Sequence, residues 1–188
     1  MASKHEPRPM PYTEAHHLLN PLRKLVLSPK KLVRRLDLKP DSAVLELGPG
    51  PGYFSLEVAQ AVPHGRLVLV DIQQEMLDMA RQRLESRGFT NVDYRKADAT
   101  SLPFDTESFD VAFLVAVLGE VPDRDACLRE IRRVLRPSGL LSLTEQNLGD
   151  PHFISRPEML RSVHAAGFQR CAQFGLSFNY TMNFRKSP

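Results

Sequence analysis

A glycine-rich segment and three acidic side chains stand where this chain could hold a small ligand. The segment reads Glu46-Leu47-Gly48-Pro49-Gly50-Pro51-Gly52, and it separates a short apolar run from a helical pattern. Asp71 ends the next apolar run, and Asp98 follows a third predicted strand, 92–96. Glycine lets the backbone come close to a ligand, and a carboxylate at position 46 would repel a phosphate but attract a cation. The pattern predicts a site for a positively charged ligand; a ligand-free turn flanked by solvated acids is the alternative.

The spacing of these residues argues against two common nucleotide sites. A dinucleotide fingerprint, Gly-x-Gly-x-x-Gly, would need its third glycine at Tyr53 or Ser55, and a P-loop would need Gly-Lys-Ser/Thr after the loop. An NAD-dependent oxidoreductase is therefore a weak alternative. Asp71 stands nineteen residues after Gly52, which suits a carboxylate that accepts hydrogen bonds from both hydroxyls of a ribose.

Short apolar runs that alternate with helical patterns must position these side chains. The predicted strands cover 44–47, 67–70, 92–96, 111–117 and 140–144, and the helical patterns cover 53–62, 74–87, 125–135 and 158–166. Apolar strands without alternation indicate a parallel sheet covered by helices on both faces. Two last runs, 168–174 and 178–184, are too close for a crossover helix and predict an antiparallel hairpin. The predicted fold is a doubly wound α/β domain with a seven-stranded, mostly parallel sheet that ends in this hairpin.

Charge separates the first forty residues from the rest of the chain. Residues 1–40 contain nine Lys or Arg against three Asp or Glu, whereas the other residues contain sixteen against nineteen. We therefore divide the chain into an N-terminal arm with a basic helix, 1–40, and a slightly acidic body, 41–188. This distribution disfavours a uniformly basic nucleic-acid binder, in which the basic residues would also lie on the globular body.

The basic helix begins at Ser28-Pro29, an N-cap followed by proline at the first helical position. We expect it to cover 29–38, with one apolar face and one cationic face; the two sets are Leu32, Val33 and Leu36, and Lys30, Lys31, Arg34 and Arg35. Three interpretations of the cationic face stay open: a solvated surface, contact with anionic lipid at the membrane periphery, or contact with an anionic substrate or a nucleic acid.

Composition narrows the class of protein further. At 188 residues the chain is one ordinary domain, and no apolar run approaches the ~20 residues of a membrane span. The start lacks the apolar region of a secretory signal, so we expect a cytoplasmic protein. Cys127 and Cys171 are too few for a disulfide framework or a cysteine-rich metal site; we expect buried thiols and no metal. The oligomeric state is not predicted.

Four stretches together resemble a known family. They are VLELGPGPGYFS, LVLVDIQQEMLDMAR, KADATSLPFDTESFDVAF and LREIRRVLRPSGLL. In this order they resemble the class I S-adenosylmethionine-dependent methyltransferases, particularly the small-molecule type of ubiquinone and menaquinone biosynthesis. The resemblance implies a Rossmann-like fold and transfer of a methyl group from S-adenosylmethionine to a small-molecule or lipid-like acceptor, with S-adenosylhomocysteine as product. A cofactor-binding regulator, or a non-catalytic subunit of a complex, is the alternative.

The resemblance also implies which residues bind the cofactor. They are Glu46 near the methionine part; Gly48, Gly50 and Gly52 along the loop; Asp71 at the ribose; Ile72, Asp98 and Ala99 at the adenine; and Leu114 and Val115 beside the sulfonium and the acceptor. Pro49 and Pro51 depart from the family pattern, because they remove two backbone donors from the loop.

No residue is an obvious general base. The candidates are His16, His17, Glu120, Glu145 and His152. The fourth strand is not followed by the Asn/Asp-Pro-Pro-aromatic motif of methyltransferases that act on nucleic-acid amines, which argues against such a target. The linker before the last helix is too short for an inserted lid, so we expect the N-terminal arm to cover the site, with Tyr12, His16 and Asn20 reaching the cofactor.

Overall fold

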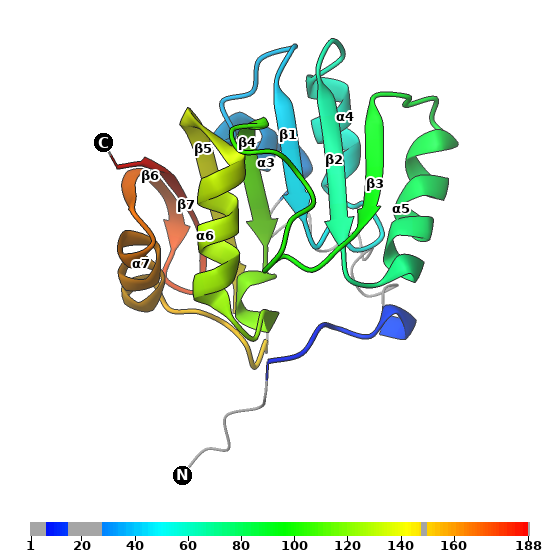
Figure 1. Cartoon of the computed structure of the whole chain (residues 1–188). Helices are drawn as coiled ribbons and strands as arrows, with labels where there is room; N and C mark the ends of the chain where they lie inside the picture. The colour runs from blue at the N-terminus through cyan, green and yellow to red at the C-terminus, as the bar shows by residue number, and fades with distance from the viewer. Residues whose placement is uncertain (1–6, 15–27, 148–149, 188) are drawn as a thin grey trace.

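A single sheet organises the molecule (Figure 1). The computed structural model describes residues 7–14, 28–147 and 150–187. Its seven strands follow the order β3-β2-β1-β4-β5-β7-β6. They are β1 (Ala43–Leu47), β2 (Arg66–Asp71), β3 (Val92–Lys96), β4 (Phe109–Val115), β5 (Leu135–Gln146), β6 (Phe168–Leu176) and β7 (Asn179–Lys186). β1 to β5 pair in parallel, and β7 runs antiparallel to both of its neighbours. The predicted fold, including the terminal hairpin, is confirmed.

Helices cover both faces of the sheet and enclose two apolar cores. One core joins α3 (Pro29–Arg35), α4 (Ser55–Ala61) and α5 (Gln74–Glu85) to the sheet through residues such as Leu32, Val58 and Leu77. The other joins α6 (Arg124–Val134) and α7 (Arg156–Ala165) through residues such as Leu128 and Met159. All five residues of β1 are buried. Burial on both faces explains why the central strands are apolar without alternation.

Two short turns complete the carboxyl edge of the sheet, the edge at which the parallel strands end. They are the 3₁₀ turns η1 (Tyr12–Glu14), within the arm, and η2 (Leu118–Glu120), just after β4. The sequence pattern predicted neither turn. Within the described parts of the chain, no helix is long and apolar enough to span a membrane.

The predicted strand at 140–144 is longer at its start than the pattern suggested. β5 begins at Leu135, directly after α6, and includes the Pro137-Ser138-Gly139 segment that was predicted to separate the two. Phe109 pairs with Leu135 and Val111 with Leu140, so residues 136–139 form a bulge opposite a single residue. Proline fits there because a bulge needs no regular ladder bond.

Two predictions about side-chain exposure were wrong. Arg35, expected on the cationic face opposite the apolar one, is half-buried: its guanidinium donates to Thr181 Oγ1 at 2.7 Å and lies over the ring of Phe174. The helix also ends three residues earlier than expected, with its cap at Leu36. Cys127 is buried as expected, but Cys171 is exposed because it lies on the edge strand β6.

Candidate functional site

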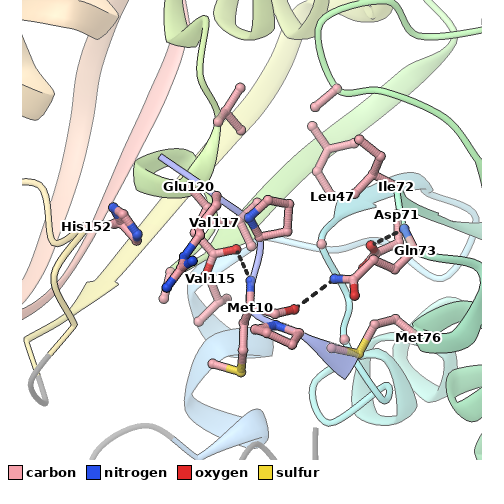
Figure 2. A pocket seen from close by; sticks show the side chains of 18 of the residues that line it. Met10, Leu47, Asp71, Ile72, Gln73, Met76, Val115, Val117, Glu120 and His152 are labelled. Carbon is pink, nitrogen blue, oxygen red and sulfur yellow. Dashed lines mark hydrogen bonds between the residues drawn. The ribbon is translucent and has the colours of Figure 1, made fainter. Parts of the chain in front are cut away.

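A cavity of about 830 Å³ opens at the carboxyl edge of the sheet (Figure 2). The ends of β1, β2 and β4 and the loop after β3 form one side of it. Seven of the ten predicted cofactor-binding residues line it: Gly48, Gly50, Asp71, Ile72, Asp98, Ala99 and Val115. Ligands of open α/β sheets bind at this edge, where neighbouring strands diverge. The fold therefore brings together side chains from segments 47–50, 70–76, 97–99 and 115–122.

The glycine loop fits closely against its surroundings. Gly48, Gly50 and Gly52 have φ values of +65°, +54° and +75°, a region that L side chains rarely adopt. A Cβ on Gly48 would lie 2.4 Å from Cγ2 of Val117, which lines the cavity. A Cβ on Gly52 would lie 3.0 Å from Leu84 of α5. Gly48 therefore lets the loop border the cavity, whereas Gly52 lets it pack against a helix.

Glu46 and Leu114 lie beneath this surface and do not line the cavity. Glu46 is buried, and its Oε2 accepts a hydrogen bond from the Ser55 hydroxyl at 2.6 Å. Burial raises the pKa of Glu46 to about 8; the Ser55 hydrogen bond lowers it and the charge of Asp71 raises it further. Glu46 thus joins the end of β1 to the first residue of α4, below the glycine loop. Leu114 belongs to the apolar core.

Backbone N–H groups orient the carboxylate of Asp71, which lines the cavity. Its Oδ1 accepts the N–H of Gln73 at 2.9 Å. Burial raises the pKa of Asp71, and hydrogen bonds from the backbone of Gln73, Gly50 and Ile72 oppose this. A carboxylate held in this way can accept two donors from a ligand without first losing side-chain freedom.

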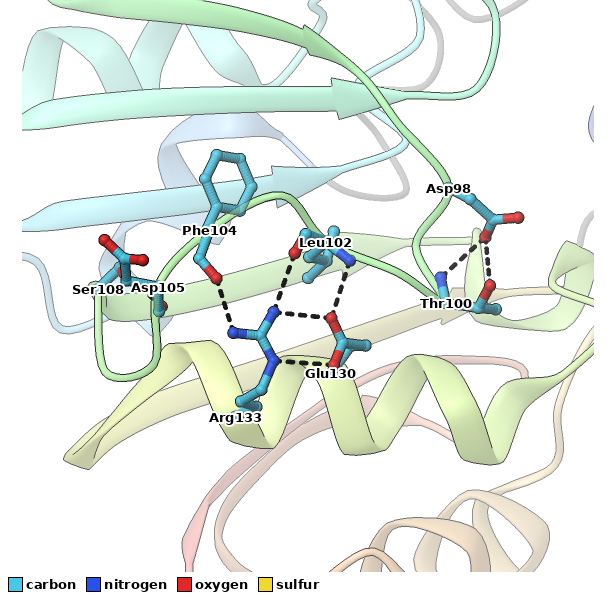
Figure 3. Close-up of polar contacts among 8 residues, drawn as sticks. All are labelled: Asp98, Thr100, Leu102, Phe104, Asp105, Ser108, Glu130 and Arg133. Atoms are coloured by element: carbon cyan, nitrogen blue, oxygen red, sulfur yellow. Dashed lines mark hydrogen bonds and ion pairs between the residues drawn. The ribbon is translucent and has the colours of Figure 1, made fainter.

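Asp98 belongs to a loop that α6 holds in place (Figure 3). Both the N–H and the hydroxyl of Thr100 donate to Asp98 Oδ1 at 2.8 Å. Farther along the loop, the Arg133 guanidinium donates to the carbonyls of Leu102 and Phe104 at 2.9 and 2.6 Å and pairs with Glu130. Glu130 also accepts the N–H of Leu102 at 2.8 Å. This network fixes the loop that carries Asp98 and Ala99.

The described part of the N-terminal arm borders the other side of the cavity. Residues 8–11 and Glu14 line it. The backbone of Met10 is held from two sides: its N–H donates to Glu120 Oε2 at 3.2 Å, and its carbonyl accepts from Gln73 Nε2 at 2.8 Å. Gln73 Oε1 in turn accepts the N–H of Tyr12 at 3.1 Å. These bonds involve only the backbone of the arm, so the arm was expected at the site but its individual contacts were not indicated by its side chains.

Two candidate bases line the cavity and one does not. Glu120 and His152 line it, on the side where Val117 also lies. Burial raises the pKa of Glu120 to about 7; the Met10 N–H opposes the shift and the charge of Asp150 adds to it. Glu145 is buried away from the cavity, with a pKa raised to about 8, mainly by burial, and an oxygen 3.5 Å from the Ile154 nitrogen.

The other residues predicted for the site are not among the described residues that line the cavity, whereas two glutamines that were not predicted are. His16, His17 and Asn20 fall outside the described residues, and Tyr12 is exposed rather than part of the lining. Gln73 and Gln146 both line the cavity without having been predicted. Strand alternation could have indicated Gln146, because its neighbour Glu145 must point to the opposite face; no pattern indicated Gln73.

Comparison with known proteins identifies the sequence family. Residues 45–143, more than half of the chain, match the family described as a methyltransferase domain. The ubiquinone/menaquinone biosynthesis C-methyltransferase of Hahella chejuensis is 38% identical over 106 residues, which are 55% of this chain and 43% of that protein. The demethylmenaquinone methyltransferase of Lactobacillus johnsonii is 33% identical over 118 residues, 62% of this chain and 48% of that protein. The chain thus spans less than half the length of these relatives.

A solved structure matches the whole architecture. An S-adenosylmethionine-dependent methyltransferase from Aquifex aeolicus superposes with a TM-score of 0.86 and 20% identity, covering 94% of this chain and 98% of that one. At this identity the likeness establishes a shared fold, including the order and direction of the strands.

Proposed function

Because the chain belongs to the methyltransferase domain family, we propose that it is an enzyme that transfers the methyl group of S-adenosylmethionine to a small-molecule or lipid-like acceptor. S-adenosylhomocysteine is the second product. The observation that carries this proposal is the cavity that joins the glycine loop, Asp71 and Asp98 at one edge of the sheet. The relatives named for quinone methylation support an apolar, quinone-like acceptor. The domain division at residue 40 and a cytoplasmic location stay predictions.

The residues along the cavity suit the parts of this cofactor. Asp71 accepts the ribose hydroxyls, Ile72 packs against the adenine, and Asp98 accepts the adenine amino group beside the N–H of Ala99. Gly48 and Gly50 leave room for the methionine part, since a side chain at Gly48 would collide with Val117. Glu46 acts through the loop, which it supports from below, and Leu114 and Gly52 act by packing.

The chain's own residues have three tasks in this reaction. When bound, S-adenosylmethionine supplies a methyl group already activated by its sulfonium, so orientation of the acceptor accounts for much of the catalysis. The arm and the apolar residues Val117, Val121 and Pro151 exclude water from the acceptor. Glu120 takes the proton that the acceptor loses, because a carboxylate with a pKa near 7 is an effective base at neutral pH.

Labelled cofactor tests the reaction directly. The full chain is incubated with S-adenosylmethionine labelled at the methyl group and with a lipid extract or a water-soluble metabolite extract. We expect label in an apolar small molecule and one S-adenosylhomocysteine for each methyl transferred. Cofactor binding by calorimetry without transfer to either extract would instead identify a cofactor-binding regulator or a non-catalytic subunit.

A single substitution tests the role of Glu120. In Glu120→Gln we expect kcat to fall about a hundredfold, the usual effect of losing a general base, while the affinity for the cofactor changes little. The rise of kcat with pH near 7 should disappear. Glu145→Gln is the matched control, because Glu145 does not line the cavity; an equal loss in both variants would contradict the assignment.

A further inference from the structure

The tip of the β6–β7 hairpin exposes three large apolar side chains. Leu176 is 65% exposed, Phe178 57% and Phe174 36%. Phe174 and Leu176 belong to the end of β6 and Phe178 to the turn that follows, so they form a single apolar projection rather than scattered surface residues. Such a group on a surface generally marks a contact with a partner or a membrane.

The projection is held at the edge of the sheet where the cavity opens. β6 runs parallel to β1, β2 and β4, so its end at Leu176 lies at their carboxyl edge (Figure 1). The N–H of Asn147 donates to the Phe178 carbonyl at 2.8 Å, and the preceding residue, Gln146, lines the cavity. On the other side, Arg156 donates to the Gly175 carbonyl at 2.5 Å. The apolar tip and the cavity therefore share one rim.

Cations of α3 lie beside the hairpin, and acids are missing from both segments. Segment 28–36 contains four Lys or Arg and no Asp or Glu, and the tip segment 172–180 contains no charged residue. Arg35 joins them, since it lies over the Phe174 ring at 5.1 Å and bonds to Thr181. Lys30, Lys31 and Arg34 are exposed on α3, and among the residues that the structure describes no ion pair joins them to a carboxylate.

We propose that the hairpin tip and the cationic face of α3 together dock this protein on an anionic membrane surface. The apolar tip enters the interfacial region of the bilayer, and each cation contributes to binding through its attraction to the anionic lipid headgroups. Charge complementarity favours this occupant over a second copy of the chain, whose own surface here would be cationic too. Docking brings the cavity rim to the bilayer, where an apolar acceptor resides. That last consequence rests on the proposed function; the docking itself does not.

Co-sedimentation with vesicles tests the proposal. The full chain is mixed with vesicles of phosphatidylcholine alone or with about a third of phosphatidylglycerol. We expect binding to the anionic vesicles only, weakened by raised salt. Leu176→Ser with Phe178→Ser should lower the partition coefficient about tenfold or more, and Lys30→Glu with Lys31→Glu similarly. Met79→Ser, an exposed apolar residue of α5, and Arg129→Glu, an exposed cation of α6, are the matched controls.

Several outcomes would overturn the docking proposal. These are no binding to anionic vesicles, equal losses in the control variants, or a dimer in sedimentation velocity that Leu176→Ser with Phe178→Ser dissolves. Circular dichroism and thermal midpoints confirm that each variant folds. Calorimetry with S-adenosylmethionine is run on the same samples, so a protein that binds vesicles but no cofactor would refute the proposed function and leave the docking surface intact.

Discussion

The two sides of the cavity are built in different ways. The side assigned to the cofactor consists of strand ends, a glycine loop with three positive φ values and a loop fixed by Arg133 and Glu130. The side assigned to the acceptor consists of a short 3₁₀ turn, the loop at His152 and an arm that Gln73 and Glu120 hold by its backbone. The geometry of the cofactor side is set by the core of the fold. The position of the arm on the acceptor side depends on a few hydrogen bonds to its backbone. Mutations should therefore separate cofactor binding from turnover.

Deletion of the arm should give the largest effect. We expect removal of residues 1–20 to reduce methyl transfer more than a hundredfold, because the acceptor side loses Arg8 to Pro11 from its lining and water enters. The affinity for S-adenosylmethionine, measured by calorimetry, should fall less than tenfold. Turnover that survives the deletion would show that the arm is not part of the acceptor site. Gln73→Ala, which removes two backbone contacts to the arm, should weaken turnover in the same direction.

Loss of the Asp71 carboxylate should affect binding instead. Asp71→Ala removes the acceptor for two ribose hydroxyls, and hydrogen bonds to a charged group contribute about 1.5–3 kcal/mol each. We therefore expect the affinity for S-adenosylmethionine to fall at least about a hundredfold. Asp93→Ala, an exposed acid in the edge strand β3, is the control. If calorimetry gave the same affinity for both variants, the assignment of Asp71 to the cofactor site would be wrong.

A smaller effect is expected from the network behind Asp98. Arg133→Ala leaves Glu130 without its ion pair and frees the carbonyls of Leu102 and Phe104. We expect a loss of about 1–2 kcal/mol in the free energy of unfolding and a severalfold lower cofactor affinity, with kcat at saturating cofactor unchanged. Urea unfolding and calorimetry measure the two quantities. Arg129→Ala, an exposed neighbour on the same helix, should change neither.

The difference between the two sides also explains how much the sequence revealed. Asp71 and Asp98 were predictable because each stands at or just after the end of a predicted strand, and parallel strands end at one edge. Gly48 and Gly50 were predictable from the same rule, whereas the buried position of Glu46 follows from contacts with α4. The arm was expected at the site because the linker before the last helix is too short for an inserted lid. The contacts of the arm were not predictable, because they are hydrogen bonds between Met10 and residues 63 and 110 positions away. Such contacts leave no local pattern.

The smallest effect concerns Glu46, which supports the glycine loop without facing the cavity. Its pKa of about 8 in the folded chain lies above the ordinary value of 4.5. The folded state therefore binds a proton at Glu46 more tightly than the unfolded state does, so the stability that this difference contributes is fully present below pH 4.5 and is lost as the pH rises towards 8. Glu46→Gln cannot ionise and keeps an oxygen for the Ser55 hydroxyl, so we expect the thermal midpoint to fall less between pH 5.5 and 8 than in the unaltered chain.

Two comparisons make this pH effect specific to Glu46. Glu120 and Glu145 also have raised pKa values, of about 7 and 8, so Glu46→Gln should reduce the slope without abolishing it. Glu75→Gln, an exposed position on α5, should leave the slope unchanged. Because the neutral acid and the amide present similar groups to the loop, cofactor affinity at pH 6 should stay within about twofold. A large loss of affinity at that pH would mean that the Glu46 carboxylate contacts the cofactor directly, and the cavity would then extend below the glycine loop when the ligand binds.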